Sequence, residues 1–388
     1  MSGTGTAGPG APLVLRWGDE RLTVVRGWPG ARGERILECR DGAGRLRAAR
    51  LAPDPANGPG AASATDAAGE RDPAAGDSAA SGVGSEPAPG WDDRLKVLPY
   101  GQDPKLRSLR PDGELLVHRA SKRAVVRTAD GFVKHLRRGR AAGVARATAE
   151  TGGLAAEAGF AVPRVVAADE DSVTLSAVPG TALLDLSEAD WARAWDRWAR
   201  LWPQLVLSPV PPAGLGTHDV ADEAEVVAGW SAHVRESDPG GFADRLREQL
   251  QAIEERTRDS LLALGGAGGR ETVVAHRDLH DGQMLFDAET GGLGLLDFDT
   301  AVAADRELDL GNLDVHVDLR VAQGLVDPAR AAVAHAAIER AADAVDADAH
   351  RLDVYRHAAR ARLVGVYAFR PQWAGLAARM AEDLARDV

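Results

Sequence analysis

The sequence predicts an α+β fold of two lobes: a β-rich N-terminal lobe with an extra N-terminal β segment, and a helical C-terminal lobe. Short segments that alternate apolar and polar residues fill most of the first 180 residues and favour strands. Apolar residues at helical spacing dominate from residue 187 onward. A chain of 388 residues, of which 45% are hydrophobic, is long enough to bury the cores of two lobes.

The first 113 residues predict a small sheet interrupted by a flexible insertion. Residues 1–11 are expected to be disordered. Residues 12–52 contain the strand-like segments LVLRW, RLTVV, RILEC and RLRAARL, and residues 91–113 contain RLKVL. Residues 53–90 are mostly Ala, Gly, Pro, Ser, Asp and Glu without any aromatic residue, so they cannot bury enough surface to offset their chain entropy. We therefore expect the segments on both sides to form one sheet, an N-terminal β extension.

Residues 114–180 predict the N-terminal lobe itself. The segments ELLVHRA, RAVVRT and FVKHL read as three strands joined by short turns, and a helical pattern follows over residues 140–158. Two further strand-like segments, PRVVAA and SVTLSAV, lead to the sequence VPG, where we expect the link between the lobes.

Residues 181–388 predict a mostly helical lobe. Ser187 and Asp190 are typical of a helix start. Trp191, Trp195, Trp198 and Trp202 follow at spacings that place them on one helix face. They are compatible with a ligand-binding box, but a buried core stripe is favoured. Further helices are predicted over residues 222–236, 240–264, 327–346, 348–365 and 372–386.

Charge and cysteine content exclude several classes of function. The net charge of −12 and a pI near 5.4 argue against a nucleic-acid or membrane-surface partner. A single cysteine, Cys39, excludes an intramolecular disulfide framework and a cysteine metal cluster. The N-terminus lacks an apolar signal core, and no run approaches the ~18 apolar residues of a membrane span. A cytoplasmic enzyme is expected, and its oligomeric state stays open.

The stretch VVAHRDLHDGQMLFD, residues 273–287, carries the candidate chemistry. Two predicted strands flank its polar centre, and the later segment LGLLDFD places Asp297 at the end of another strand. Loops at the ends of these strands would bring Asp278, Gln283 and Asp297 to one mouth. Carboxylate and amide oxygens suit Mg²⁺ held together with substrate phosphates. A nearby aspartate could orient a hydroxyl and accept its proton, which is the division of labour in phosphoryl transfer.

This spacing resembles the H-x-D-x-x-x-x-N…D pattern of the aminoglycoside phosphotransferase and choline kinase family, which is related to protein kinases by fold. The resemblance spans about residues 114–320 and implies a bilobal protein-kinase-like fold. It makes Asp278 the catalytic base and His276 a support of the loop. It makes Gln283 and Asp297 ligands of Mg²⁺, and Asp299 an additional metal ligand. Gln283 stands where the family more often has Asn.

The resemblance also assigns roles outside this stretch. Asp309, within DRELDLGNL, would brace the catalytic loop. Lys134 would contact the phosphates of ATP, and Glu150 on the following helix would hold that lysine, with Glu157 as the second choice. Only four of the 46 basic residues are lysines, in a composition typical of a GC-rich genome. Retention of a lysine at residue 134 therefore supports a role that arginine does not fill.

Two nucleotide contacts are expected from backbone segments. The turn at Ser121 and Lys122 lies where the family folds a loop over the phosphates, although it has no glycine. Ser176 and Val178 lie in the link whose backbone would hydrogen-bond adenine. Acidic residues after Asp297, namely Asp305, Glu307 and Asp314, lie where the family often meets a cationic or polyhydroxyl acceptor.

The resemblance predicts an ATP- and Mg²⁺-dependent phosphotransferase that acts on a hydroxyl of a small molecule. An aminoglycoside, a sugar, an aminocyclitol or another natural product fits equally well, because function resides in the acceptor site and not in the fold. Two alternatives stay open: a biosynthetic kinase of Ser or Thr hydroxyls in a peptide, and a non-catalytic module that binds a nucleotide or a partner.

Overall fold

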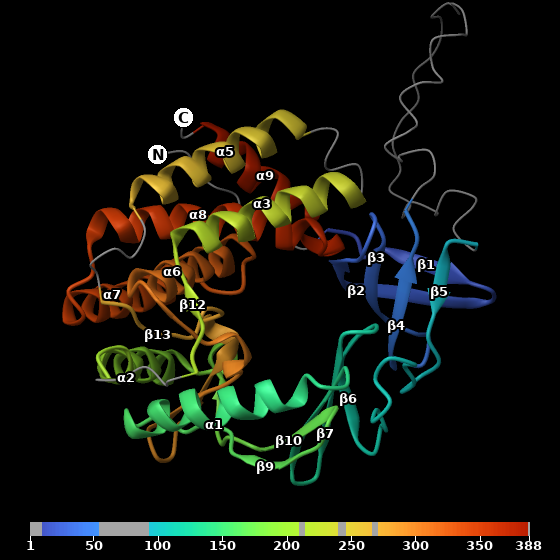
Figure 1. The fold of residues 1–388 in the computed structure, drawn as a ribbon, viewed down its shortest axis with the longest axis horizontal. Coiled ribbons are helices and arrows are strands. Elements are labelled where there is room, and N and C mark those ends of the chain that lie inside the picture. Colours follow the sequence, from blue (N-terminus) through green and yellow to red (C-terminus); the bar gives the residue numbers. More distant parts are fainter. Residues whose placement is uncertain (1–9, 54–92, 209–213, 240–245, 266–270, 387–388) are drawn as a thin grey trace, which may run out of the picture.

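The computed structural model describes residues 10–53, 93–208, 214–239, 246–265 and 271–386 (Figure 1). It has a β-rich N-terminal half and a helical C-terminal half, which confirms the predicted fold class. The segments expected to be disordered or flexible, residues 1–11 and 53–90, lie outside the described residues except at residues 10, 11 and 53. No helix in the described part of the chain has the length and apolarity to cross a membrane.

The first sheet is an antiparallel meander in the order β1-β2-β3-β4-β5. Its strands are β1 (Val14–Trp17), β2 (Glu20–Pro29), β3 (Arg35–Arg40), β4 (Leu46–Leu51) and β5 (Leu95–Val97). Leu15, Leu22 and Leu51 are fully buried on one face. Since β5 pairs with β4, strands from both sides of the insertion form one sheet, as the sequence predicted.

The second sheet has the order β6-β7-β8-β10-β9 and is antiparallel throughout. Its strands are β6 (Glu114–Arg119), β7 (Arg123–Thr128), β8 (Gly131–Leu136), β9 (Val165–Ala168) and β10 (Ser172–Ser176). Helix α1 (Ala141–Glu157) connects β8 to β9 and packs on η5 (Phe298–Thr300) of the C-terminal lobe. Lys134 lies on the central strand β8, opposite Val125 and Val173.

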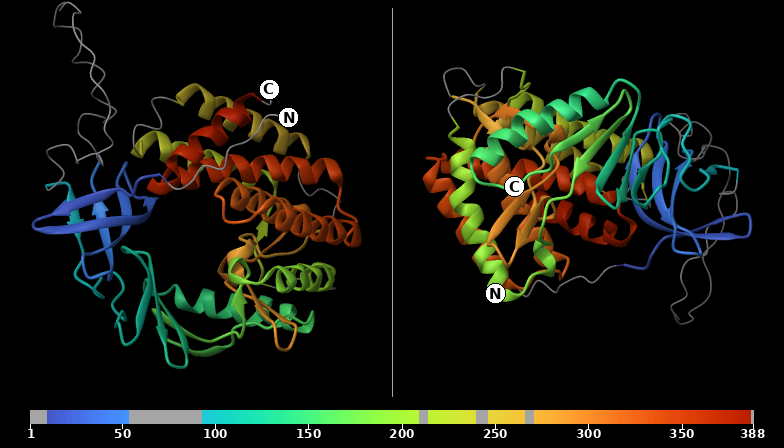
Figure 2. Two further views of the ribbon diagram at one scale, coloured as in Figure 1. Left: turned by 180° about the vertical axis from the view of Figure 1, so that it is seen from behind. Right: turned by 90° about the horizontal axis from the view of Figure 1, so that it is seen from below.

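The first sheet touches both lobes (Figure 2). Strands β3 and β4 pack against β6, where Ile36, Ala48 and Ala120 share one apolar cluster. On the other side, Gly27 of β2 donates its backbone N–H to the carbonyl oxygen of Phe369 at 2.8 Å. A Cβ atom at residue 27 would lie 3.0 Å from that oxygen, so glycine allows the close approach. The N-terminal extension therefore bridges the N-terminal lobe and the end of helix α8.

The C-terminal lobe is built from helices around two small three-stranded sheets (Figure 1). Its helices are α2 (Glu188–Val206), α3 (Val220–Ser237), α5 (Arg247–Ala263), α6 (Glu307–Ala322), α7 (Pro328–Ala344), α8 (Ala349–Ala368) and α9 (Ala374–Arg386), with the short turns η3 (Leu183–Asp185), η4 (Asp281–Gln283) and η6 (Pro371–Trp373). The small sheets are β11-β14-β15, from Thr181–Ala182, Met284–Asp287 and Gly292–Leu295, and β12-β16-β13, from Thr217–His218, Val302–Ala304 and Val273–Ala275. The loop of residues 276–283 connects β13 of one small sheet to β14 of the other.

The tryptophan stripe of α2 is part of the core, which confirms the favoured interpretation. Trp191, Trp195, Trp198 and Trp202 are each at most 1% exposed, and their rings contact one another in series with centroids 5.6–5.8 Å apart. Ser187 caps the helix by accepting the Asp190 N–H. The stripe therefore supports the lobe from behind the catalytic loop and does not contact a ligand site.

Helix α6 was not predicted as a helix. Twelve of its 16 residues are buried, including the polar side chains Glu307, Asp309, Asn312, Asp314 and His316. A helix that is buried on nearly every side lacks the polar stripe that makes helical periodicity visible in a sequence. Two of these buried polar side chains, Asp309 and Asn312, contact the backbone of the loop at residues 276–279.

Candidate active site

The catalytic loop spans residues 276–283 between β13 and β14. Strand β13 ends at Ala275 and β15 at Leu295, and His276 Nε2 donates to the Leu296 carbonyl oxygen at 2.7 Å, so the residues that follow these two strands lie side by side. Asp278 follows the first strand and Asp297 the second. This contact brings together the two segments that carry the carboxylates.

Asp309 on α6 lies directly beneath the loop. Its two carboxylate oxygens accept the backbone N–H groups of His276 at 2.6 Å and Arg277 at 2.8 Å. Burial raises the pKa of Asp309 to about 6, and the two donated N–H groups offset part of that rise. One buried carboxylate thus fixes the backbone on the N-terminal side of Asp278.

His276 lies behind the loop and not in front of it. Its Nε2 donates to the carbonyl oxygen of Leu296 at 2.7 Å, which ties the loop to the strand that leads to Asp297. The ring packs on Phe298, and Thr300 donates its hydroxyl to the His276 carbonyl oxygen at 3.1 Å. These contacts tie the segment that carries Asp278 to the segment that carries Asp297. They are the contacts expected of a residue that supports the loop.

Two residues of the site adopt the left-handed backbone conformation. Arg277 has φ +67° and Asp297 has φ +61°. Such a conformation costs a non-glycine residue roughly 1–2 kcal/mol, and it persists only where the surroundings enforce it. At Arg277 the two hydrogen bonds to Asp309 supply that enforcement. Strain of this kind clusters at functional sites.

Lys134 pairs with both aspartates of the segment Asp297-Phe298-Asp299. Its Nζ lies 2.6 Å from Asp297 Oδ1 and 2.8 Å from Asp299 Oδ1, and the lysine is only 9% exposed. Burial raises the pKa of Asp297, but the Lys134 ammonium outweighs burial and holds that pKa below its ordinary value. Burial raises the pKa of Asp299 above its ordinary value, because Lys134 offsets burial less there and Asp297 adds repulsion.

The donor set fits a divalent cation. Asp297 and Asp299 already converge on one cationic centre, and hard carboxylate oxygens are the ligands that Mg²⁺ prefers. Gln283 is the last residue of η4, and its amide nitrogen lies 3.5 Å from His280 Nε2. That separation is too long for a firm hydrogen bond, so this contact does not fix the amide.

The structure does not bring Glu150 to Lys134. The side chain of Glu150 is exposed on α1, as is that of Glu157, and the buried face of this helix carries Thr148, Thr151 and Gly152 instead. Gly152 lets Phe298 approach, since a Cβ atom there would lie 3.5 Å from the Phe298 ring. The assignment of a helix glutamate to the lysine is therefore corrected: Asp297 and Asp299 hold Lys134.

Ser121 also departs from its expected role. Its backbone N–H donates to Asp103 Oδ2 at 2.6 Å, and its hydroxyl oxygen accepts from Arg50 at 3.4 Å. Both groups serve contacts with the N-terminal extension and the segment that follows it, so neither is free for a phosphate. Lys122 and Arg123, the next two residues, line the cavity described below.

Ser176 and Val178 lie in the link between the two lobes. Ser176 accepts the Arg164 N–H through its hydroxyl and donates its own N–H to the Arg164 carbonyl oxygen, both at 2.9 Å. Val178 packs closely on Gly294 of β15. A Cβ atom at residue 294 would lie only 2.6 Å from Val178 Cγ1, so glycine allows this close contact. A contact of these two residues with adenine stays a prediction.

A cavity of about 1080 Å³ opens in front of Asp278. The β6–β7 turn, the β8–α1 loop and the first turns of α1 form one wall, and α3, α6 and α8 form the other. Arg277, Asp278 and Asp299 lie between the two walls. Asp278 therefore faces a space large enough for a small molecule. The group formed by Lys134, Asp297 and Asp299 lies beside this space.

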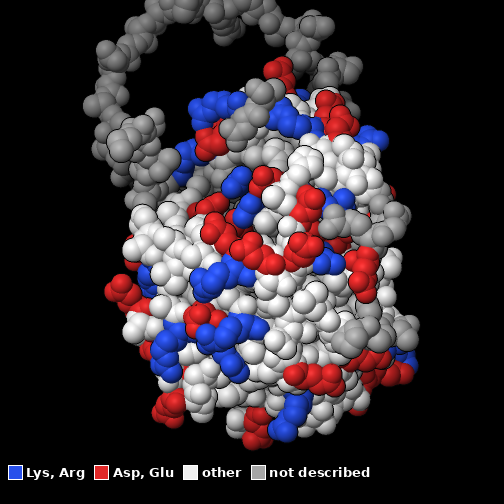
Figure 3. Space-filling model, turned by 90° about the vertical axis from the view of Figure 1, so that its left-hand side faces the viewer, with Lys and Arg blue, Asp and Glu red and all other residues white. Residues whose placement is uncertain are grey.

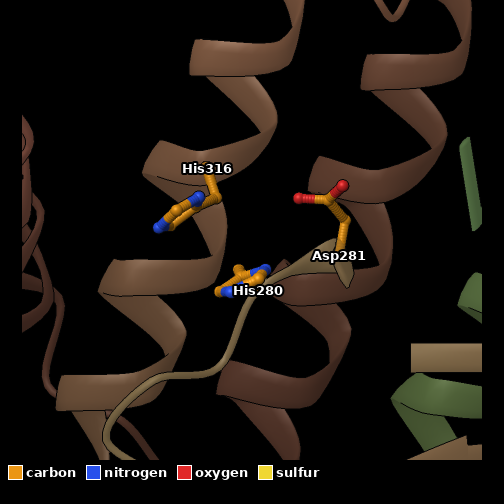
Figure 4. Close-up of side chains that lie close together, drawn as sticks. All are labelled: His280, Asp281 and His316. Atoms are coloured by element: carbon orange, nitrogen blue, oxygen red, sulfur yellow. The ribbon is translucent and has the colours of Figure 1, made fainter. Parts of the chain in front are cut away.

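The second half of the loop lies beside His316 of α6 (Figure 4). Asp281 is 3% exposed, and both its oxygens lie 3.0 Å from Arg320 Nε. The His280 ring stacks on His316 of α6 with centroids 4.9 Å apart, and burial lowers the pKa of both histidines. The ligand atoms of these three residues lie within 4.8 Å of one another, but Arg320 already neutralises Asp281. This group is best explained as packing.

The acidic residues expected near an acceptor are engaged elsewhere. Asp305 accepts from Arg351 and from the Tyr355 hydroxyl, the latter at 2.9 Å. Asp314 pairs with His335 at 2.6 Å and Arg356 at 2.7 Å. Glu307 is 1% exposed and accepts the Asp348 N–H at 2.8 Å. All three stabilise contacts among the C-terminal helices, so the expectation that they meet the acceptor is corrected.

Sequence reasoning missed two supports of the site. Asn312 on α6 donates its amide to the Leu279 carbonyl oxygen at 2.8 Å, and Arg362 on α8 donates to the Asn312 side-chain oxygen. Asp103 fixes the turn at Ser121. The sequence gives no local signal for either contact, because the partners lie 18 to 50 residues apart and meet only in the folded chain.

Comparison with known proteins identifies the class. The phosphotransferase enzyme family matches residues 112–347, which is more than half of the chain. The chain therefore belongs to this family of phosphotransferases, and the resemblance drawn from its motifs is confirmed. No curated protein matches the sequence.

Several solved structures resemble the chain at low identity. An aminoglycoside phosphotransferase of Streptomyces rimosus is 20% identical with a TM-score of 0.43, covering 64% of this chain and 92% of that one. An aminoglycoside-3'-phosphotransferase of type VIII is 22% identical with a TM-score of 0.45, covering 66% and 96%. A spectinomycin phosphotransferase solved with ADP and spectinomycin is 12% identical with a TM-score of 0.48, covering 70% and 91%. At these values the structures carry no information about the acceptor of this chain.

Proposed function

We propose that this phosphotransferase transfers the γ-phosphate of ATP to a hydroxyl group of a small molecule, with Mg²⁺ as the metal. The observation that carries the proposal is the arrangement of Lys134, Asp297 and Asp299 beside Asp278 at the mouth of one cavity. A lysine for phosphates, carboxylates for a metal and an aspartate for a hydroxyl are the parts that phosphoryl transfer requires.

In this proposal Asp278 orients the acceptor hydroxyl and accepts its proton. The hydroxyl oxygen forms a bond to the γ-phosphorus while the bond to the bridging oxygen of ADP breaks, and the proton passes from Asp278 to solvent. Lys134 stabilises charge on the phosphates after its carboxylate partners turn toward the metal. Gln283, Asp297 and Asp299 would hold Mg²⁺, which supplies further charge neutralisation when bound. Asp309 and His276 keep the loop in register.

We further propose that residues 114–180 and 181–388 form the two lobes of the enzyme and that residues 12–52 and 91–113 extend the first lobe. The extension contacts the turn at Ser121 and also the end of α8. It is therefore suited to limit how far the lobes can move apart when a nucleotide enters.

A non-catalytic nucleotide-binding module is the second candidate. It is favoured by the exposed Glu150, by the engaged backbone N–H of Ser121 and by glutamine at residue 283. Each of these departs from the pattern that the motifs predict for an active kinase. The two candidates differ in whether Asp278 participates in turnover.

Transfer of labelled phosphate from ATP to a panel of hydroxyl compounds, including a Ser/Thr peptide, tests the proposal. We expect Mg²⁺-dependent transfer to at least one small molecule and none with Asp278→Asn, although nucleotide binding by that variant persists. Binding of ATP without transfer to any member of a broad panel would favour the binding module. Transfer to the peptide alone would favour a peptide kinase.

A further inference from the structure

The cavity in front of Asp278 differs from the chain as a whole in its charge. The protein has a net charge of −12, and on the outer face in Figure 3 acidic and basic side chains are interspersed. The cavity is lined by nine basic and three acidic residues. Among the described residues, Arg138 is the only basic one of the nine that forms an ion pair with a carboxylate.

The three acidic residues do not neutralise this excess. Glu223 is bound to His218 Nε2 at 2.8 Å, and Asp299 is bound to Lys134 at 2.8 Å. The third is Asp278, whose carboxylate is assigned to the acceptor hydroxyl. The basic side chains of the cavity therefore face one another, and burial together with Arg137, Arg119 and Arg140 lowers the pKa of Lys122.

Among the basic residues of the cavity, Arg277 is the one best placed to contact a ligand. It keeps an arginine side chain at φ +67°, a conformation that glycine adopts without strain. Its backbone is held by Asp309, but in the described chain no carboxylate pairs with its guanidinium, which lines the cavity next to Asp278. A strained residue with an unpaired cation beside the catalytic base is expected to serve a ligand.

Arginines on the surrounding walls add to this charge. Arg119 stacks on Trp28 at 5.2 Å, and its buried Nε has no hydrogen-bond partner within the described residues. Arg140 and Arg146 come from the start of α1, and Arg362 comes from α8. Arg277, Arg146 and Arg362 thus approach the space in front of Asp278 from three different elements.

A bound nucleoside triphosphate would neutralise part of the positive charge of the cavity, but not all of it. Lys134, Lys122 and Arg123 lie on the strand and turn that would cover the phosphates. The lining of the cavity excludes the link residues 176–179, where adenine is expected, and extends to α3, α6 and α8. The helical wall therefore belongs to the acceptor side, and it contributes Arg362, which also donates to the Asn312 side-chain oxygen.

We propose that the acceptor is itself an anion: a small hydroxylated molecule that carries a phosphate or carboxylate group, which Arg277 binds together with arginines of the cavity walls. This inference rests on the proposed phosphotransferase function and names the substrate class of the same site. Guanidinium groups bind both anions through paired, charge-assisted hydrogen bonds. A cationic acceptor is disfavoured because it would be repelled by the same residues.

Matched probes test the charge of the acceptor separately from catalysis. The full chain, saturated with ADP and Mg²⁺, is titrated calorimetrically with glucose 6-phosphate, gluconate, glucose and glucosamine, and with glycerol phosphate, glycerate, glycerol and aminopropanediol. We expect at least one anionic member to bind about tenfold more tightly than its neutral counterpart. Preference for the phosphate or for the carboxylate member decides between the two anions.

Variants connect this binding to the named residues. Arg277→Gly suits the local backbone, so the chain should fold at least as well while the anionic probe binds about tenfold to a hundredfold more weakly. Arg277→Lys should recover part of the loss, and Arg146→Gln should weaken the same probe. Arg200→Gln on the exposed face of α2 is the control and should change nothing.

The outcomes separate the two proposals. Equal or tighter binding of neutral or amino probes, or the absence of binding by every anionic probe, overturns the anionic-acceptor inference, whether or not phosphate transfer is found. Tighter binding of the anions that is lost in Arg277→Gly supports it. If that binding occurs but no acceptor is ever phosphorylated, the phosphotransferase proposal fails while the anion site stands.

Discussion

The two halves of the catalytic loop contain similar residues in opposite surroundings. Arg277 and Asp278 face the cavity, and no carboxylate of the described chain neutralises Arg277. His280 and Asp281, only two or three residues later, pack against α6, where Arg320 holds Asp281 with both its oxygens at 3.0 Å. Within this loop, Arg277 and Asp278 are therefore available for chemistry, whereas His280 and Asp281 are committed to folding.

This difference shows why residue type alone does not define a site. Asp278 and Asp281 are both aspartates on one short loop, yet the cavity reaches only the first of them. A buried carboxylate that is already paired with arginine has no capacity left for a substrate proton. The two halves are thus expected to respond differently to mutation, in activity for the first and in stability for the second.

The largest effect on the catalytic side outside the loop itself is expected at Lys134. Lys134→Arg keeps the positive charge, but a planar guanidinium cannot take the place of a compact ammonium between Asp297 and Asp299. We expect kcat/KM for phosphate transfer to fall roughly 10²–10³-fold. Lys96→Arg on the exposed side of β5 is the matched control, and equal activity of both variants would contradict the role of Lys134.

In the half of the loop that packs on α6, Arg320→Met removes the ion-pair partner of the buried Asp281 carboxylate. Because Asp281 would then be left without its counter-ion, we expect a loss of about 3 kcal/mol in the free energy of unfolding, measured with denaturant. Activity per folded molecule should change little. Arg200→Met breaks an exposed pair with Asp196 and should leave stability unaltered. A large loss of turnover without a loss of stability in Arg320→Met would contradict the division of the loop.

Asp309 holds the backbone of the loop, and its titration makes the stability of the protein depend on pH. Its pKa in the folded chain is about 6, above the ordinary value of 3.8, so the folded state favours the protonated form. The stability that this preference contributes is present below pH 4 and is lost as the pH rises through 6. It amounts to on the order of 3 kcal/mol.

Asp309→Asn removes this titration and one of the two hydrogen bonds to the loop. Between pH 4 and 7 the wild type should lose stability relative to the variant, while the variant transfers phosphate about tenfold more slowly. Denaturant unfolding at several pH values measures the first effect. Parallel stability curves for the two proteins would show that Asp309 does not titrate in this range.

The smallest expected effect belongs to Gln283. Asparagine at residue 283 has a side chain shorter by one methylene, which draws the amide oxygen closer to the loop backbone. We expect Gln283→Asn to raise the Mg²⁺ concentration for half-maximal activity by roughly two- to tenfold, as altered ligand geometry weakens a metal site. An unchanged Mg²⁺ dependence would remove Gln283 from the ligand set.

Local patterns predicted most of the fold. Alternation predicted the strands of both five-stranded sheets, and the polar stretch between β13 and β14 predicted the catalytic loop. Helix α6 escaped because burial on nearly all sides leaves no amphipathic pattern. The chain order of the motifs likewise pointed to Lys134, Asp278, Asp297 and Asp309, whose roles stay predictions.

What the sequence did not reveal depends on side chains that meet across large separations. The partner of Lys134 lies 163 residues away, so the orientation of α1 decided against Glu150. The arginines of the cavity come from positions between 119 and 362, and an acidic overall composition conceals them.

The central claim is that Asp278 performs chemistry while Asp281 stabilises the loop. Asp278→Asn and Asp281→Asn, assayed side by side, test it most directly through kcat and thermal unfolding. We predict that Asp278→Asn lowers kcat about 10²–10⁴-fold with an unchanged Tm, and that Asp281→Asn lowers the Tm while folded molecules keep most of their activity. A normal kcat in Asp278→Asn, or a loss confined to kcat in Asp281→Asn, would contradict the claim.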